Sequence, residues 1–195
     1  PVVLSISKKY NLGAHYNYTM CGFSINNVSD NNSTDVSSLK VASLKAVSAM
    51  GISNSFFSVD VLSTEDGPIV LECGILLDCK VDRLLYYAGL DIYSMVIDVL
   101  TGNLKVIEEP KLNMDYALAF MFSDKTGRLV RPEMMDVKNA LAVEWERKWG
   151  EIVNPPKSIA DTLGWVITSS STGSAYNRAK NIAYSGLFQV HNGEA

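Results

Sequence analysis

Hydrophobic residues recur at helical spacing in several segments of the chain. Thr34 or Asp35 can cap a first helix, whose apolar positions continue until Gly51, a residue type that suits the position after a helix end. Two further helices are predicted over 80–88 and 92–101. Aspartate and glycine residues mark their ends: Gly89 follows the first, Asp91 can cap the second, and Gly102 follows the second.

Apolar runs of strand length predict the strands. They lie at 2–8, at 55–74 as a hairpin, at 116–123 with 128–131 as its partner, at 149–156 as an extended segment, and at 164–169. A last helix is expected after Thr172, and it carries on one face Ala175, Ala179, Ile182 and Ala183. Because helices are mixed with hairpins and do not alternate strictly with strands, the sequence predicts an α+β fold.

The predicted hairpin carries an acidic residue in the middle of each strand. A three-residue turn at 65–67 places Val61 opposite Leu71, so that the apolar residues of both strands share one face. The same register places Asp60 opposite Glu72 on the other face. The two acids are therefore predicted to face each other across the hairpin.

Two like charges in opposed positions destabilise a hairpin, because facing Cβ atoms are only about 5 Å apart. A divalent cation between Asp60 and Glu72 would remove this conflict, and Mg²⁺ prefers carboxylate oxygens as ligands. The alternative is a solvated face on which each acid has its own Lys or Arg neighbour. The spacing of the two acids fits both interpretations.

The order of several short motifs resembles that of the ATP-grasp superfamily. The matching stretches are AVSAMGI at 46–52, SFFSVDV at 55–61, IVLECGIL at 69–76, AGLDIYSMVIDVLTG at 88–102, and the segment 150–179. The chain resembles the C-terminal portion of these enzymes. The resemblance implies that residues 1–102 form the C-terminal half of the catalytic domain, and that residues 103–195 form a small, β-rich closing subdomain.

The resemblance also implies an ATP-dependent and Mg²⁺-dependent ligase. In such enzymes the hairpin acids hold Mg²⁺ against the ATP phosphates, a carboxylate substrate becomes an acylphosphate, and an amine or similar nucleophile displaces the phosphate. Asp60 and Glu72 match the two metal-binding positions. Lys80 and Arg83, in the following helix, are candidates to contribute positive charge toward the nucleotide. The alternative is that Lys80 and Arg83 simply lie on a solvated helix face. No residue is assigned as catalytic.

Two positions depart from the family pattern. Gly74 stands where the family usually has Asn, and Leu76 stands where it usually has Arg. These departures support a second interpretation, in which the chain is a degenerate, non-catalytic ATP-grasp-like domain with a structural or interaction role. The lysines and the adenine-contacting linker of the family find no match. We therefore take the chain to be part of a longer protein and expect it not to turn over alone.

Composition narrows the class of partner. The 195 residues carry a net charge of −4 and have a pI near 5.2, which argues against nucleic acid or an anionic membrane as a partner. Three cysteines, an odd number, fit a reducing compartment, so we expect the protein in the cytoplasm. The partners that the resemblance implies are small-molecule carboxylate and amine substrates. A homo-oligomer is also expected, since an exposed apolar face favours self-association.

Overall fold

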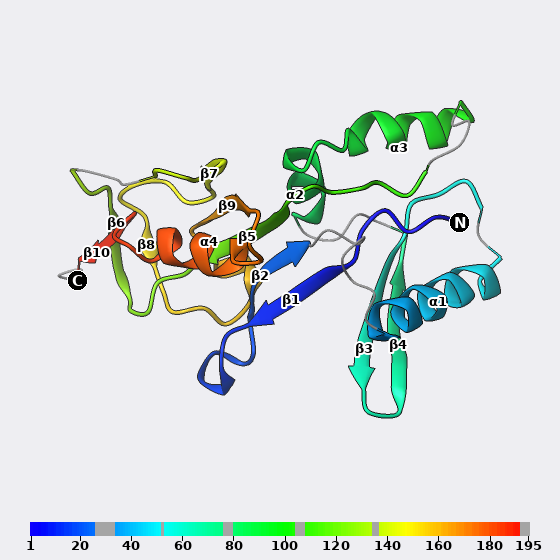
Figure 1. Ribbon diagram of the computed structural model, residues 1–195. Helices are drawn as coiled ribbons and strands as arrows, with labels where there is room; N and C mark the ends of the chain where they lie inside the picture. The colour runs from blue at the N-terminus through cyan, green and yellow to red at the C-terminus, as the bar shows by residue number, and fades with distance from the viewer. Residues whose placement is uncertain (26–33, 52, 76–79, 104–107, 134–136, 192–195) are drawn as a thin grey trace. The chain divides into compact units, whose positions relative to one another are not determined.

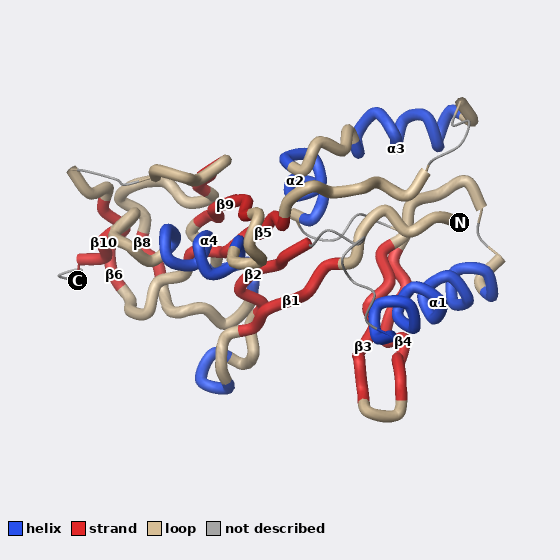
Figure 2. The backbone as a smooth tube through the Cα atoms, viewed as in Figure 1, coloured by secondary structure: helices blue, strands red, loops and turns tan. Residues whose placement is uncertain are grey.

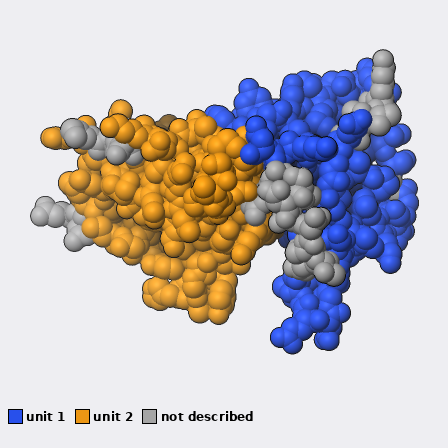
Figure 3. Space-filling view, viewed as in Figure 1, with its two compact units in different colours: residues 1–6, 27–113 blue, residues 7–26, 114–195 orange. Residues whose placement is uncertain are grey.

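The structure is a computed structural model that describes residues 1–25, 34–51, 53–75, 80–103, 108–133 and 137–191. The chain forms two compact units (Figure 3). The first contains residues 1–6 and 27–113, and the second contains residues 7–26 and 114–195. This division differs from the predicted domains 1–102 and 103–195, chiefly because residues 7–26 group with the C-terminal part of the chain.

The part of the first unit that the structure describes contains the predicted hairpin and three helices (Figures 1 and 2). Its elements are α1 (Thr34–Ala49), β3 (Ser58–Thr64), β4 (Gly67–Gly74), α2 (Val81–Tyr87) and α3 (Ile92–Thr101). α1 packs against both strands of the hairpin. Each of these elements lies in a segment for which the sequence predicts the same type of structure.

Local interactions fix both ends of α3. The carboxylate of Asp91 accepts hydrogen bonds from the hydroxyl of Ser94 at 2.7 Å and from its backbone N–H at 3.1 Å. These bonds lower the pKa of Asp91, with the bond from the hydroxyl as the largest cause, because they favour the ionised carboxylate. Gly102 ends the helix in the left-handed conformation, with φ of 72°, which glycine adopts without a steric penalty. Both predicted end signals are confirmed.

In the part of the chain that the structure describes, no single helix is both long and apolar enough to cross a membrane. α2 and α3 reach the required length and composition only when taken together, and the chain bends by 112° between them.

The second unit is built on a five-stranded antiparallel sheet in the order β1-β2-β5-β9-β7. Its strands are β1 (Ser7–Asn11), β2 (Met20–Ile25), β5 (Asp115–Met121), β7 (Ala142–Trp145) and β9 (Gly164–Ser170). A three-stranded sheet in the order β10-β6-β8 contains β6 (Gly127–Val130), β8 (Ile152–Val153) and β10 (Gln189–His191). The remaining elements among the described residues of this unit are α4 (Ala175–Ala183) and two 3₁₀ helices, Ala14–Tyr16 and Ile159–Asp161. The mixture of helices and antiparallel sheets confirms the predicted α+β class.

Small residues let α4 approach the five-stranded sheet. Ala175, Ala179 and Ala183 are buried, as the helical spacing predicts. Ala179 and Ala183 join a core formed with residues of β5 and β9, whereas Ile182 is only partly buried at its margin. The helix begins after Ser174 rather than at the predicted cap, Thr172.

Several strand predictions are corrected by the structure. The first strand is Ser7–Asn11 rather than 2–8. β6 does not pair with β5, as predicted for 128–131, but with β8 and β10. β5 lies instead between β2 and β9. Its near-continuous apolar run is buried on both faces, which is the pattern of a central strand and not of one arm of an isolated hairpin.

Candidate functional site

The turn of the β3–β4 hairpin is tighter than the sequence predicts. Thr64 pairs with Gly67, which leaves two loop residues instead of the predicted three. The hydroxyl of Thr64 donates a hydrogen bond to the carbonyl oxygen of Gly67 at 2.7 Å and closes this turn. The predicted three-residue turn at 65–67 is therefore wrong by one residue.

A β-bulge compensates for this difference before the strands reach the acids. Val61 lies opposite Val70, whereas the predicted register placed it opposite Leu71. The next pair is Asp60 with Glu72, so Leu71 is an extra residue in β4. The predicted opposition of the two acids is confirmed, because the shorter turn and the bulge cancel each other.

The bulge also decides on which face of the hairpin Glu72 lies. Side chains alternate between faces along a regular strand, so Val70 and Glu72 would then share a face. The extra residue Leu71 reverses this alternation, and Glu72 comes to share the face of its partner Asp60. A regular hairpin with the same turn would place the two acids on opposite faces.

The chemistry of the acid pair fits a hydrated hard cation. Asp60 is half-buried and Glu72 is exposed, so both carboxylates remain accessible to water. In the described ranges, His, Cys, Asp and Glu side chains do not gather in groups of three that could hold a metal ion. Mg²⁺ usually keeps several water ligands and needs only one or two carboxylates, together with substrate phosphates. The donor set therefore suits Mg²⁺ better than a metal held in a closed protein cage.

The two candidate nucleotide-binding residues lie at the start of α2. Lys80 precedes the helix in a left-handed conformation with φ of 62°, and its side chain is half-buried. Arg83 is exposed, and its guanidinium carbon lies 5.8 Å from the ring centroid of Tyr93. The hydroxyl of Tyr93 in turn donates a hydrogen bond to Asp82 at 2.7 Å. Their role toward a nucleotide stays a prediction.

Position 76, at which the family pattern has Arg, lies outside the described residues, as does Cys79. The departure at Gly74 can be examined, because this glycine is the last residue of β4 and pairs with Ser58. Sequence reasoning gave no role to Ser58. Its position two residues before Asp60, on the same face of a predicted strand, was a signal that could have singled it out.

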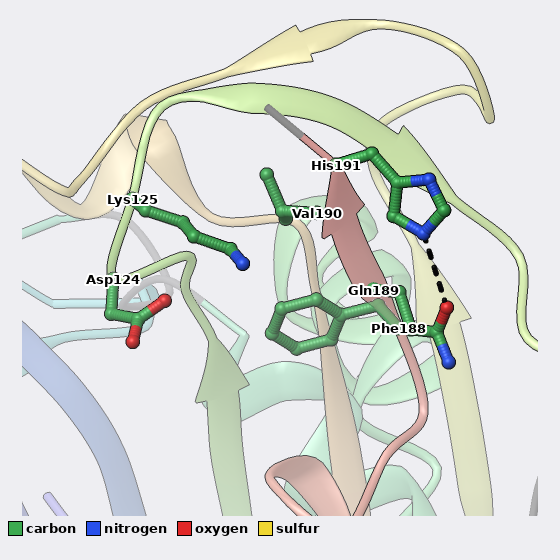
Figure 4. Close-up of a pocket in the computed structure, with 6 residues that line it drawn as sticks. All are labelled: Asp124, Lys125, Phe188, Gln189, Val190 and His191. Atoms are coloured by element: carbon green, nitrogen blue, oxygen red, sulfur yellow. Dashed lines mark hydrogen bonds between the residues drawn. The ribbon is translucent and has the colours of Figure 1, made fainter. Parts of the chain in front are cut away.

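A shallow, open pocket of about 380 Å³ lies in the second unit (Figure 4). Its lining residues are Asp124, Lys125, Phe188, Gln189, Val190 and His191. A nitrogen of the His191 ring, Nε2, lies 3.3 Å from the amide oxygen of Gln189. The pocket contains no residue that the sequence analysis assigned to a site.

Comparisons with known proteins identify the fold. The sequence matches no protein-family model and no curated protein. The solved structures similar to the chain include three at low sequence identity. They are a phosphoribosylglycinamide synthetase from Anaerococcus prevotii (TM-score 0.76, 13% identity), an L-amino acid ligase from Bacillus licheniformis (0.73, 16%) and a biotin carboxylase from Campylobacter jejuni (0.61, 12%).

The similarity covers almost all of this chain and about half of each of the other three. For the synthetase it extends over 96% of this chain and 49% of that protein. For the ligase and for the carboxylase it extends over 98% of this chain and 48% of the other protein. All three proteins are ATP-grasp ligases. The chain therefore shares the fold of these ATP-grasp ligases and spans about half the length of each of them.

Proposed function

We propose that this chain is the part of an ATP-grasp ligase that holds Mg²⁺ and the phosphates of ATP during the activation of a carboxylate substrate. The observation that carries the proposal is the opposition of Asp60 and Glu72 on one solvent-accessible face of the hairpin. The fold shared with ATP-grasp ligases supports the same assignment. The carboxylate would become an acylphosphate, and an amine or similar nucleophile would then displace the phosphate.

The chain's own contribution to this reaction is to place two carboxylates where negative phosphates arrive. Two acids alone would repel a polyphosphate. Mg²⁺, when bound, supplies positive charge that offsets this repulsion during phosphoryl transfer. Asp60 and Glu72 hold the ion, and Lys80 and Arg83 add positive charge at the start of α2. The substrates are small-molecule carboxylates and amines, and the reaction takes place in the cytoplasm. The free thiols of Cys21 and Cys73 support a reducing compartment.

The test is phosphate release by the protein that the complete reading frame encodes, with Mg²⁺, ATP and a panel of carboxylates and amines. We expect Asp60→Asn and Glu72→Gln each to lower the rate by at least about a hundredfold, since each removes charge that positions the phosphates. The matched control is Asp66→Asn, because Asp66 is exposed in the turn of the same hairpin. It should leave the rate near that of the unchanged protein.

The competing proposal is a degenerate domain with a structural or interaction role, and Gly74 is the observation that favours it. The same assay separates the two proposals. If the protein releases phosphate at comparable rates with and without the two acids, or does not release it with any substrate, the acids have no catalytic role. The non-catalytic interpretation then holds.

A further inference from the structure

The base of the hairpin, from the bulge to the open ends of the strands, places a third oxygen-bearing side chain on the face of the acids. Three pairs are regular there: Ser58 with Gly74, Val59 with Cys73, and Asp60 with Glu72. Because faces alternate along a strand, Ser58 lies on the face of Asp60, and Gly74 lies on that of Glu72. Ser58 and Gly74 are thus the next pair after the acids on that face, toward the open ends of the strands.

The hydroxyl of Ser58 lies directly above Gly74. A Cβ atom added to Gly74 would lie only 2.9 Å from Oγ of Ser58, which is closer than ordinary van der Waals contact. The serine side chain is therefore turned toward β4, into the space that a side chain at position 74 would otherwise fill. Gly74 is not among the glycines with positive φ, so its backbone conformation would accept another residue.

We propose that the Ser58 hydroxyl is the third oxygen donor of the metal-binding face, alongside the carboxylates of Asp60 and Glu72. This inference rests on the proposed function. A hydroxyl oxygen is a neutral, hard donor of the kind that Mg²⁺ accepts, and Ser58 is half-buried beside the acid pair. Gly74 then has a physical role: because it has no side chain, the hydroxyl of Ser58 from the opposite strand can occupy the space above it.

The test uses Mn²⁺ as the probe, because its binding can be followed by electron paramagnetic resonance without any turnover. Ser58→Ala in the full-length protein should weaken Mn²⁺ binding by about fivefold, the usual net effect of one polar contact. Ser63→Ala is the matched control, since Ser63 lies in the same strand near the turn and pairs with Pro68. It should leave the affinity unchanged.

A second variant separates a metal donor from a residue that only supports the hairpin. In Ser58→Ala/Gly74→Asn the hydroxyl that a Cβ at 74 would meet is gone, and the amide oxygen of Asn offers a donor from the other strand. We expect this double variant to recover Mn²⁺ affinity to within about twofold of the unchanged protein. A purely structural role of Ser58 would not be rescued in this way.

The outcomes distinguish this inference from the proposed function. If Asp60→Asn abolishes Mn²⁺ binding while Ser58→Ala leaves it unchanged, Ser58 is not a donor and the acid pair still is. If Ser58→Ala weakens binding and the double variant does not restore it, the donor role is likewise overturned. If neither Asp60→Asn nor Glu72→Gln alters Mn²⁺ binding, the proposed function fails at its metal site.

Discussion

The rings of Tyr10 and Tyr176 stack face to face, with centroids 3.6 Å apart and planes only 3° from parallel. Tyr10 belongs to the edge strand β1, and Tyr176 belongs to α4. The hydroxyl of Tyr176 also lies 3.1 Å from the thiol of Cys21 in β2, and that of Tyr10 lies 3.1 Å from the hydroxyl of Ser24. The tyrosine pair therefore connects the helix to the edge strand β1 and to its neighbour β2.

Truncating Tyr176 should destabilise the second unit far more than removing its hydroxyl alone. Tyr176→Phe keeps the stacked rings and loses only the contact with Cys21, so we expect a cost of about 1 kcal/mol. Tyr176→Ala also loses the ring contact and leaves a cavity, so we expect about 3–5 kcal/mol. Urea unfolding followed by far-ultraviolet circular dichroism measures both values. Equal costs for the two variants would show that the ring stack adds no stability.

Alkaline pH should destabilise the fold through tyrosine hydroxyls that are partly shielded from water. Burial raises the pKa of Tyr184 to about 12 from its ordinary value of 10.0, and Cys21 nearby adds to the shift. Between these values the unfolded chain loses the phenolic proton while the folded chain keeps it, so the free energy of unfolding falls as pH rises. Burial, followed by the hydrogen bond with Cys21, raises the pKa of Tyr176 as well.

In Tyr184→Phe the free energy of unfolding should fall less steeply as pH rises. The variant also lacks the hydrogen bond that Tyr184 donates to the carbonyl of Phe120 at 3.1 Å. Urea midpoints taken from about pH 9 to about pH 12 give the comparison. A variant whose stability falls as steeply as that of the unchanged chain would show that Tyr184 does not cause the loss.

Neutralising one acid of the hairpin should not destabilise the metal-free protein. Asp60→Asn or Glu72→Gln removes a repulsion between directly opposed carboxylates, so we expect a gain of about 0.2–1 kcal/mol without metal. Urea unfolding in the presence of a chelator measures the effect. A marked loss of stability would mean that the carboxylate makes a structural contact within the fold, and the metal interpretation of the pair would be weakened.

Self-association is expected from apolar side chains that the first unit exposes. Leu71 in the hairpin is 65% exposed, and Leu100 in α3 is 76% exposed. Ile69 and Ile97, which lie close to these leucines in the sequence, are each more than half exposed. We expect sedimentation velocity to show a dimer or larger species as protein concentration rises, because contiguous apolar surface favours association. Leu71→Ser and Leu100→Ser should shift the equilibrium toward the monomer, and a monomer at every concentration would refute the prediction.

Helix ends of the first unit could be predicted because their signals are local. Asp91 and Gly102 act on residues within a few positions of themselves, so the sequence contains what is needed. The pairing of β2 with β5 could not be predicted in this way. Met20–Ile25 and Asp115–Met121 are far apart in sequence, and their pairing depends on the common core that they form with β9 and α4.

The acid pair shows a different limit of sequence reasoning. A three-residue turn, and a two-residue turn followed by a bulge, use the same number of residues to bring Asp60 opposite Glu72. The pattern of apolar and acidic positions therefore predicted the correct pair with an incorrect turn. The position of Ser58 two residues before Asp60 predicts only that the two residues share a face, whereas the close approach of its hydroxyl to Gly74 is visible only in the structure.

The bulge at Leu71 makes the tip of the hairpin a separate segment from its base. The pairs from Val61 with Val70 to Thr64 with Gly67 keep one register, and those from Ser58 to Asp60 keep another. A reporter such as a tetracysteine tag or a short epitope can therefore be inserted between Glu65 and Asp66, because exposed turns tolerate added residues and the faces of the acids are fixed beyond the bulge. The hairpin offers a labelling position that is close in sequence to the face of Asp60 and Glu72 and leaves the register of that face unchanged.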